Sequence, residues 1–490
     1  MEKTDKQIFF LGIGGIGMSA LARYYKHEGY AVAGYDRTPS ALTRELEKEG
    51  IRVFYEDEPE VLKKAFGTEL TDWTDAKGLE VVWTPAVPKD TKLYQFLLAN
   101  GAHIQKRAEA LGKITAMKKP LCVAGTHGKT TTSTMLAHLL AQSKEQGTKH
   151  KDGEGDGVNA FLGGISENYK TNLLLDSESE YVVVEADEFD RSFHHLRPYM
   201  SVVTSVDPDH LDIYGTPEAY QESFEHYCNL VSDTLVLKHG LQDRLHLNTR
   251  ARVLTYSAED SRAYFYAANV VVGEGSIIFD LHHPGGVIEG LQLGVPVWVN
   301  IENSVAAAAI ALLCGVTDEQ IRAGLASFAG VHRRFNIHVQ TPEVAYIDDY
   351  AHHPQEIAAS IASVRKLYPQ RHLLGIFQPH LYTRTRDFAE EFAKVLSTLD
   401  EVILLPIYPA RELPIEGVNS EMLMEKILVE RQKTKDKRQK TNATILSKDE
   451  LVAQIGERAR KMAPVAVLTI GAGDIDRLVP AIAEKLKSEN

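Results

Sequence analysis

The sequence has few cysteines, no long apolar run and no excess of basic residues. Its three cysteines among 490 residues, Cys122, Cys228 and Cys314, are widely spaced and fit neither a disulfide framework nor a zinc site. No apolar run approaches the ~20 residues that a membrane-spanning helix requires, so we expect no membrane insertion. The N-terminus runs directly into a strand pattern, which argues against a signal peptide. Together these absences predict a protein of the reducing cytoplasm.

The net charge of -13 argues against a nucleic-acid-binding protein, because such proteins usually carry a basic surface. Small anionic substrates remain compatible with it, since local lysines and arginines are enough to hold them. A hydrophobic content of 44% and a charged content of 25% are typical of a globular protein. The length favours roughly three domains.

The most informative stretch is LCVAGTHGKTTTST, Leu121 to Thr134. It predicts a buried strand, a glycine-containing loop and a helix that opens at Lys129-Thr130, which together form a cradle for phosphate groups. The lysine would reach the outer phosphates, and the Thr130 hydroxyl would hold Mg²⁺. The loop is the short G-T-x-G-K-T form of the pattern. The simpler alternative is a glycine-rich turn before an ordinary helix.

A second glycine motif, Gly12-Ile13-Gly14-Gly15-Ile16-Gly17, follows a strand pattern at residues 6–11 and precedes a helix pattern. Such a turn lets the backbone approach a diphosphate closely. Asp36 ends the next strand, where an acid often contacts a ribose. The motif therefore indicates a dinucleotide or a nucleoside diphosphate, and the alternative is tight packing of helix on sheet.

Acidic residues follow the strand at residues 181–184 in the run EADEFD, which places four acids within residues 185–190. Next to a phosphate loop, such a cluster favours Mg²⁺, and the alternative is a solvated acidic turn. His210 follows the next strand, at residues 202–206. A lone histidine is more often structural, but its place beside the acids favours a metal ligand.

Polar residues gather again near the C-terminal strands. HRRF at 332–335 precedes a strand that ends in DDYAHHP at 348–354, and QPHLYTRTRD follows another strand at 378–387. The carboxyl ends of parallel strands share one edge of a sheet, so these groups predict a site there. The two arginines of HRRF are either surface charges or ligands of a transferring phosphoryl group.

The alternation of strands and helices predicts an α/β protein of three domains: residues 1–117, 118–330 and 331–490. Within the second domain we expect antiparallel strands over residues 251–300, then a buried helix around Val305 to Val316. The polar, glycine-rich run at Lys144 to Gly157 predicts an exposed insertion.

Seven motifs in this order resemble the Mur ligase family of peptidoglycan synthesis, and the resemblance covers nearly the whole chain. They are GIGGIGMS (12–19), GTHGKTTT (125–132), EADEFDRSFHHLRP (185–198), DPDHLDIY (207–214), HRRF (332–335), DDYAHHP (348–354) and FQPHLYTRTRD (377–387). The resemblance implies a Rossmann-like N-terminal domain, a central P-loop ATPase-like domain and a C-terminal Rossmann-like domain that closes the site.

The implied reaction is an ATP-dependent amide ligation through an acyl phosphate. Within the family, the motifs are most similar to the branch that joins L-alanine to UDP-N-acetylmuramate, and the nearest alternative is the recycling branch that adds a whole tripeptide. An NAD-dependent oxidoreductase and a non-catalytic nucleotide-gated protein are more distant alternatives, because both leave later motifs unexplained. We expect a monomer or a weak homodimer.

By resemblance, the residues divide into four sets. Catalysis is assigned to Lys129, His210, Arg334 and Asp349; ATP binding to Gly125, Thr126, His127, Gly128, Lys129, Thr130, Thr131, Asn303, Arg334 and Asp349; Mg²⁺, expected as two ions, to Thr130, Glu185 and His210; and the substrates to Gly12, Gly14, Gly15, Gly17, Asp36, Tyr350, His352, Thr383 and Arg384. Three positions depart from the family pattern. Glu302 and Ala306 replace a histidine and an asparagine beside Asn303, and Leu381 replaces an arginine.

Overall fold

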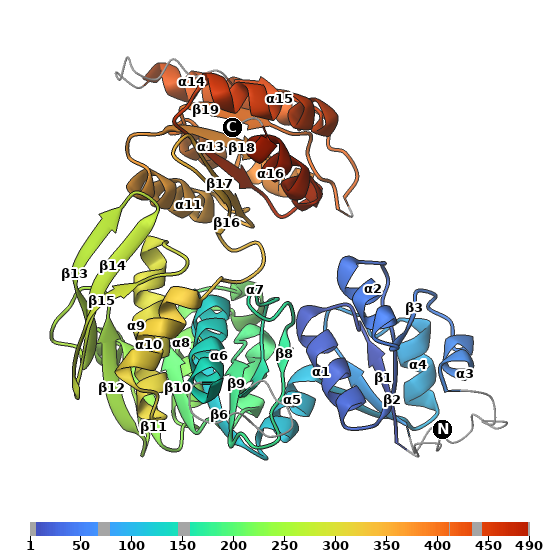
Figure 1. Cartoon of the computed structure of the whole chain (residues 1–490). Helices are drawn as coiled ribbons and strands as arrows, with labels where there is room; N and C mark the ends of the chain where they lie inside the picture. Colours follow the sequence, from blue (N-terminus) through green and yellow to red (C-terminus); the bar gives the residue numbers. More distant parts are fainter. Residues whose placement is uncertain (1–5, 67–78, 146–156, 411, 434–442, 489–490) are drawn as a thin grey trace. The chain divides into compact units, whose positions relative to one another are not determined.

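The computed structural model describes residues 6–66, 79–145, 157–410, 412–433 and 443–488 (Figure 1). These residues form two compact units. One contains residues 1–268, 281–288 and 302–325, and the other contains residues 269–280, 289–301 and 326–490. Most of the predicted insertion at Lys144 to Gly157 lies outside the described residues. The three-domain boundaries at 117 and 330 stay a prediction.

A five-stranded parallel sheet of order β3-β2-β1-β4-β5 opens the first unit. Its strands are β1 (Gln7–Leu11), β2 (Ala31–Tyr35), β3 (Arg52–Phe54), β4 (Glu80–Trp83) and β5 (His103–Lys106), with helices α1 (Ile16–His27), α2 (Ala41–Lys48), α3 (Glu60–Phe66), α4 (Lys92–Ala99) and α5 (Arg107–Thr115). The strand order reverses between β1 and β4. Ligands of open α/β sheets bind at this kind of switch point, beyond the carboxyl ends of the strands.

Alternating side chains of β1 enter two different apolar cores. Ile8 and Phe10 belong to one core, and Phe9 and Leu11 to the other, because successive side chains of a strand point to opposite faces. The first core continues into the central sheet, where it includes Val184. The N-terminal and central sheets of this unit are therefore joined by continuous apolar packing.

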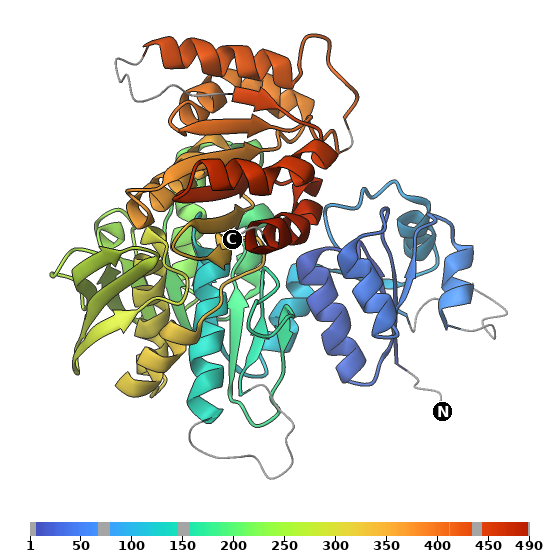
Figure 2. The ribbon, with the colours of Figure 1, turned by 45° about the horizontal axis from the view of Figure 1, so that its top comes forward.

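The central sheet has ten strands in the order β15-β14-β13-β12-β11-β10-β6-β9-β7-β8. Its strands are β6 (Lys119–Ala124), β7 (Asn159–Phe161), β8 (Leu173–Leu174), β9 (Tyr181–Glu185), β10 (Met200–Val203), β11 (Thr234–Lys238), β12 (Arg252–Ser257), β13 (Phe265–Gly273), β14 (Ser276–His283) and β15 (Gly286–Gln292). The helices are α6 (Lys129–Glu145), α7 (Leu211–Tyr214), α8 (Pro217–Cys228), α9 (Trp298–Leu313) and α10 (Asp318–Ser327), with 3₁₀ helices η2 (Phe189–His195) and η3 (Leu241–Asp243). Helix α6 packs on β6 and β9, as Figure 2 shows.

The expectation of antiparallel strands over residues 251–300 was wrong for β12. This strand pairs in parallel with both β11 and β13, so it extends the parallel sheet. Two-residue turns at 274–275 and 284–285 join β13, β14 and β15, and only antiparallel neighbours allow such short connections. Composition alone did not distinguish a last parallel strand from a first hairpin strand.

Helix α9 confirms the predicted buried helix, since residues 305–311 are at most 1% exposed. Among the described residues, no helix is long and apolar enough to cross a membrane.

The second unit contains a six-stranded sheet of order β16-β17-β21-β18-β19-β20. Its strands are β16 (Asn336–Gln340), β17 (Val344–Asp349), β18 (His372–Phe377), β19 (Glu401–Leu404), β20 (Ala443–Ile445) and β21 (Val465–Ile470), with helices α11 (Pro354–Leu367), α12 (Tyr382–Asp387), α13 (Ala389–Leu396), α14 (Ser420–Lys433), α15 (Lys448–Lys461) and α16 (Val479–Ser488) and the 3₁₀ helix η4 (Asp474–Leu478). All pairings except β16 with β17 are parallel. The chain moves outward from β17 to β20 and then returns to β21, so right-handed crossovers place α15 on the face opposite α13 and α14.

A buried carboxyl group lies within this sheet. Asp348 of β17 accepts a 2.8 Å hydrogen bond from the Thr469 hydroxyl, and its carboxylate lies 3.9 Å from the Arg333 guanidinium. Burial nevertheless raises the pKa of Asp348 from 3.8 to about 6; the Thr469 hydrogen bond, Arg333 and His332 oppose the rise, and Asp349 adds to it. Folding therefore favours the protonated, neutral form of the Asp348 side chain.

We predict that Asp348→Asn makes the second unit less sensitive to pH. Because the folded pKa exceeds the unfolded one, the stability that Asp348 contributes is present below about pH 4 and is lost as the pH rises through about 6. Relative to wild type, the variant should gain up to about 3 kcal/mol between pH 4 and pH 8. Hydrogen exchange of β17 and β21 peptides at several pH values measures this gain. The exposed Glu484→Gln is the control, and identical pH profiles for wild type and Asp348→Asn would contradict the prediction.

Candidate active site

The glycine loop that the sequence predicts to bind phosphate, residues 125–128 (the phosphate loop), connects β6 to α6 at the middle of the central sheet. Ala124 of β6 pairs with Val203 of β10, and Val123 pairs with Glu185 of β9. The loop, the acidic segment and the residues after β10 therefore lie at one edge of the sheet. Gly125 has φ of +135°, and a Cβ there would collide with the Thr204 side chain, so only glycine fits.

The loop is fixed by the segment after β10. The Thr126 hydroxyl bonds the Asp207 carbonyl at 2.7 Å and the Tyr220 hydroxyl at 3.0 Å. The His127 amide donates to the Ser205 hydroxyl at 3.0 Å. These contacts fix the loop that leads into α6, which begins at Lys129 and continues through Thr130 and Thr131.

The Lys129 ammonium turns back onto its own loop. It donates to the carbonyl oxygens of Gly125 at 2.5 Å and Thr126 at 3.3 Å, and it lies 2.9 Å and 2.8 Å from the two carboxylate oxygens of Glu188. The Lys129 and Glu188 side chains are 14% and 3% exposed. A phosphate at this loop would compete with Glu188 for the same ammonium.

Burial raises the pKa of both acids nearest to Lys129. For Glu185 and Glu188, burial outweighs the lowering effect of the lysine charge. The Thr130 hydroxyl also stabilises the charged form of Glu185. Both carboxylates would therefore gain from an additional cation.

The acids are suited to a metal, although they do not form a complete site by themselves. Glu185 Oε2 is buried and has no hydrogen-bond partner among the described residues. It abuts Gly163, where a Cβ would collide with the carboxylate. No group of three or more histidine, cysteine or acidic side chains in the described part of the chain is arranged to hold a metal. Mg²⁺ commonly takes one or two carboxylates and completes its shell with substrate phosphates and water, and this donor set fits that pattern.

His210 lies beside the same segment. It precedes α7 in a left-handed conformation with φ of +52°, and its ring packs edge-on against Phe189 at 5.2 Å between centroids. Its Nε2 lies 3.8 Å from the Asp209 carboxylate. Unusual backbone conformations of this kind cluster at functional sites.

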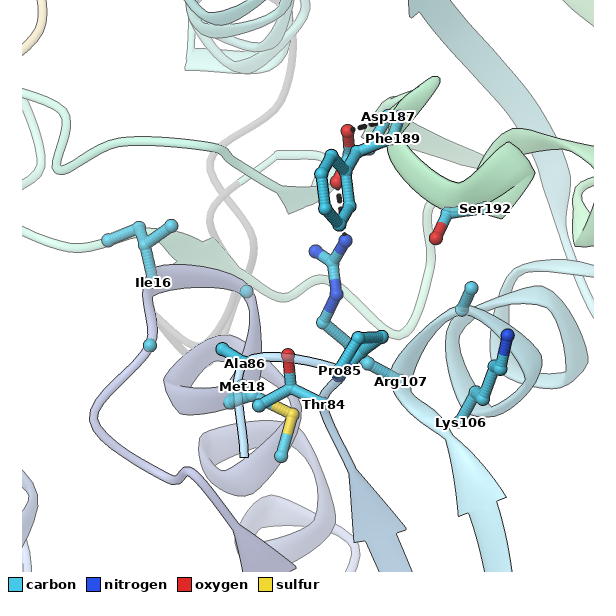
Figure 3. A pocket seen from close by; sticks show the side chains of 13 residues that line it. Ile16, Met18, Thr84, Pro85, Ala86, Lys106, Arg107, Asp187, Phe189 and Ser192 are labelled. Atoms are coloured by element: carbon cyan, nitrogen blue, oxygen red, sulfur yellow. Dashed lines mark hydrogen bonds and ion pairs between the residues drawn. The ribbon is translucent and has the colours of Figure 1, made fainter. Parts of the chain in front are cut away.

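A pocket of about 360 Å³ lies at the switch point of the N-terminal sheet (Figure 3). Its wall comes from the turn after β1, the loop after β4, the start of α5 and the acidic segment. The lining residues are Gly15, Ile16, Gly17, Met18, Thr84, Pro85, Ala86, Lys106, Arg107, Ala108, Asp187, Phe189 and Ser192.

Two of the predicted glycines line this pocket, and two do not. Gly15 and Gly17 lie in its wall, whereas Gly12 and Gly14 form the turn beneath them. Asp36 accepts a 2.9 Å hydrogen bond from the Gly14 amide, so its carboxylate supports the turn. A Cβ on Gly17 would collide with the Arg107 guanidinium, so glycine makes room for that side chain.

The sequence reasoning missed two cations in this pocket. Arg107 lies 2.6 Å from Asp187, and Lys106 lies 2.8 Å from Asp190. Figure 3 shows the Arg107 side chain reaching toward Asp187 and Phe189. Adjacent basic residues at the end of a strand, His103–Lys106, were the available signal.

The departure at Glu302 has a structural counterpart. Its carboxylate pairs with Lys238 at the end of β11, at 2.9 Å. The neighbouring Asn303 accepts a 3.2 Å hydrogen bond from Thr132, and its side-chain oxygen lies 2.7 Å from where a Cβ of Gly128 would sit. Asn303 therefore contacts the phosphate loop. Ala306 is fully buried in α9.

In the second unit, the carboxyl ends of β17, β21 and β18 meet at one edge. Asp349 and Phe377 both pair with Ile470, so the loops after them begin at the same level. His352 packs edge-on against Tyr350 at 5.3 Å and lies 6.5 Å from His380, between ring centroids. An Arg384 nitrogen lies 3.4 Å from His380. Burial lowers the pKa of both histidines, and Arg384 contributes.

Asp349 and the two arginines of HRRF have distinct surroundings. Asp349 bonds the Ser360 hydroxyl and accepts a 3.3 Å hydrogen bond from the Phe335 amide. Arg333 reaches the carbonyls of Gly471 and Gly473. The Arg334 guanidinium lies 5.8 Å from the Tyr350 ring centroid, and this residue is exposed.

Thr383 and Leu381 lie at the start of α12. Both the amide and the hydroxyl of Thr383 donate to Glu412, with 2.9 Å for the amide. Leu381 has φ of +69°. Since a leucine rarely adopts such a conformation, the surrounding loop fixes this position.

Comparison with known proteins gives a consistent result. Residues 7–119 match the Mur ligase family catalytic domain, residues 123–311 the Mur ligase middle domain, and residues 333–473 the Mur ligase glutamate ligase domain. A Porphyromonas gingivalis protein named UDP-N-acetylmuramate–L-alanine ligase is 50% identical over 485 residues, which cover 99% of each chain.

Two solved structures share the fold. The crystal structure of the UDP-N-acetylmuramate–alanine ligase of Thermotoga maritima is 24% identical, with a TM-score of 0.76 over 99% of this chain and 100% of that one. A murein peptide ligase of Psychrobacter arcticus is 21% identical, with a TM-score of 0.62 over 98% of this chain and 99% of that one. The predicted α/β architecture is confirmed. With three matched domains and a half-identical relative along nearly its whole length, this chain belongs to the Mur ligase family.

Proposed function

We propose that this chain ligates L-alanine to the lactyl carboxylate of UDP-N-acetylmuramate at the expense of ATP, the first peptide-forming step of peptidoglycan precursor synthesis. The observation that carries the proposal is the 50% identity, along 99% of both chains, to a protein named for this reaction. The proposal is supported by a glycine loop at the middle of one sheet and by a pocket at the switch point of another, since both are suited to bind a nucleotide.

The chemistry explains why one protein needs both places. A carboxylate is a poor electrophile, so it first attacks the γ-phosphate of ATP to give an acyl phosphate and ADP. The amine of L-alanine then attacks the acyl carbon, and phosphate leaves. The protein must therefore hold two anions close together, and catalysis of phosphoryl transfer rests mainly on positioning and charge stabilisation.

The ATP phosphates are assigned to the loop Gly125–Thr131, and Lys129 stabilises the transferring group. Asn303 supports the loop, while Arg334 and Asp349 are assigned to ATP from the second unit. Gly15, Gly17 and Arg107 bind the diphosphate of the nucleotide sugar, and Gly12, Gly14 and Asp36 support that turn. Tyr350, His352, Thr383 and Arg384 are assigned to the muramoyl carboxylate and L-alanine.

Thr130 and Glu185 would hold Mg²⁺, and His210 is assigned to a second ion. When bound, Mg²⁺ neutralises charge on the transferring phosphoryl oxygens. The buried, unpartnered Glu185 oxygen is the feature that favours this assignment.

Measuring ADP release with UDP-N-acetylmuramate and either L-alanine or the tripeptide tests the proposed substrate. We expect turnover with L-alanine and at most slow turnover with the tripeptide. Turnover with the tripeptide alone would instead establish the recycling reaction.

We predict that Lys129→Ala abolishes ligation. Loss of one preorganised group at a developing charge costs at least about 10²–10³ in rate, and ADP formation with both substrates measures it. The substitution also leaves the buried Glu188 without its cation, which destabilises the fold. The double variant Lys129→Ala/Glu188→Gln should therefore regain stability and stay inactive.

Lys170→Ala is the matched control, because Lys170 is exposed and forms an ion pair with Glu167, three residues earlier in the chain. Wild-type turnover by a folded Lys129→Ala/Glu188→Gln variant would refute the role assigned to Lys129.

We predict that Glu185→Gln weakens metal binding, because the substitution removes the charge of the side chain and keeps its size and shape. Substitution of a residue that only hydrogen-bonds to a metal ligand typically lowers metal affinity about 10–100-fold. Substitution of Glu185, a proposed ligand itself, should therefore raise the Mg²⁺ concentration for half-maximal ADP formation at least about tenfold. Mn²⁺ binding by paramagnetic resonance, with an ATP analogue present, provides a readout besides activity. Glu180→Gln, immediately before the first residue of β9, is the control. An unchanged Mg²⁺ requirement would exclude Glu185 as a ligand.

A further inference from the structure

Both cations of the nucleotide-sugar pocket are neutralised by acids of one short segment. Arg107 pairs with Asp187 at 2.6 Å, and Lys106 pairs with Asp190 at 2.8 Å. The basic residues are adjacent in sequence, and the acids are three residues apart. The pocket that is expected to receive a diphosphate is therefore lined by one carboxylate, Asp187, that pairs with Arg107, while Asp190 pairs with the other lining cation, Lys106.

The Arg107 pair lies across the pocket wall. Arg107 begins α5, whereas Asp187 follows β9, and Figure 3 shows the guanidinium extended between them. The same guanidinium packs against Gly17 at the start of α1, where backbone amides and the helix N-terminus favour an anion. The Arg107 guanidinium therefore lies between the Asp187 carboxylate and the start of α1, which is suited to bind a diphosphate.

The segment that carries the acids is held in an uncommon backbone conformation. Asp190 and Arg191 both have positive φ values, +51° and +55°, although neither is glycine. Residues in such conformations are kept there by surrounding contacts. Here the contacts include the two ion pairs and the Arg191 guanidinium over the Tyr214 ring at 4.6 Å.

We propose that the segment Asp187–Asp190 is an internal anion that occupies Arg107 and Lys106 until the diphosphate of a nucleotide sugar replaces it. This inference rests on the proposed function and makes Asp187 and Asp190 competitors of the diphosphate for the two cations. The diphosphate takes over the Arg107 guanidinium, and Asp187 is released from it. No covalent bond changes.

The exchange also reaches the phosphate loop, because the same segment contains Glu188. Glu188 pairs with Lys129, and its backbone carbonyl accepts a hydrogen bond from Tyr214. Three cations from two sites are thus bound by residues 187–190. A shift of this segment on binding of the nucleotide sugar changes the surroundings of Lys129.

Asp187→Asn tests the exchange directly. The amide keeps the oxygen that accepts the Phe189 amide hydrogen bond at 3.1 Å, so the local turn is retained, while the competing charge is removed. Calorimetric titration with UDP-N-acetylmuramate, in EDTA and without ATP, should show about fivefold tighter binding, as expected for a partly exposed ion pair. Asp190→Asn should give a smaller gain, because Lys106 is more exposed than Arg107, 40% against 23%.

A double-mutant cycle separates exchange from a general charge effect. Arg107→Gln should weaken binding, and Asp187→Asn should give no gain in the Arg107→Gln background. A gain that persists without Arg107 would show that removal of any nearby negative charge suffices, and would overturn the proposal. Asp260→Asn, which breaks an ion pair with Arg262 elsewhere in the unit, is the control for net charge.

Weaker or unchanged binding by folded Asp187→Asn would also overturn the exchange, since it would mean that Asp187 only orients Arg107 or is idle. This failure is distinguishable from failure of the proposed function. In the first case wild type still binds UDP-N-acetylmuramate and forms ADP with L-alanine, and in the second it does neither.

Discussion

The ion pair between Lys129 and Glu188 is the interaction on which the active-site arrangement depends. A protein that binds two phosphate-bearing substrates would be expected to collect cations, yet this one places acids within contact of its key lysine. Because both side chains are nearly buried, neither charge is tolerated without the other or a substitute. Under the proposed function, a bound phosphate would take the place of Glu188 at the lysine, and Glu185 and Glu188 could then face a metal ion. Under that function, the ion pair that joins Lys129 to Glu188 is thus the contact that the ligands would replace.

Topology explains where these charges converge. In the N-terminal and central sheets, the chain changes direction beside the strand that precedes a glycine loop, which is the place where open α/β sheets bind ligands. In the N-terminal sheet this point lies between β1 and β4, where the pocket is found. In the central sheet it lies at β6, with the acidic segment after one neighbouring strand and the Thr204–Asp207 loop after the other.

The sequence predicted the strand–loop–helix units well, because glycine spacing and apolar periodicity are local. The loops at Gly125 and Gly12, the buried helix α9 and the α/β class follow from such signals. Partners distant in sequence were not predictable. Three such contacts depend on which strands become neighbours. They are the ion pair of Glu188 with Lys129, the hydrogen bond of Asp36 with the Gly14 amide, and the ion pair of Lys238 with Glu302. The parallel pairing of β12 was missed for the same reason, since pairing direction is not encoded in the composition of one strand.

The pocket can bind a ligand selectively only if its walls are fixed relative to one another, and a buried amide provides this. Asn172, fully buried beside β8, donates to the Ile16 carbonyl at 2.6 Å and to the Ser19 hydroxyl at 3.0 Å, and it accepts from Arg23 at 2.5 Å. Arg23 is in turn held by Glu49. These contacts secure the first turn of α1 against the central sheet, so the glycine wall of the pocket is preorganised. Under the exchange proposed above, the adjustable wall would be the acidic segment, because its Asp187 and Asp190 ion pairs are partly exposed and residues 190 and 191 have positive φ values.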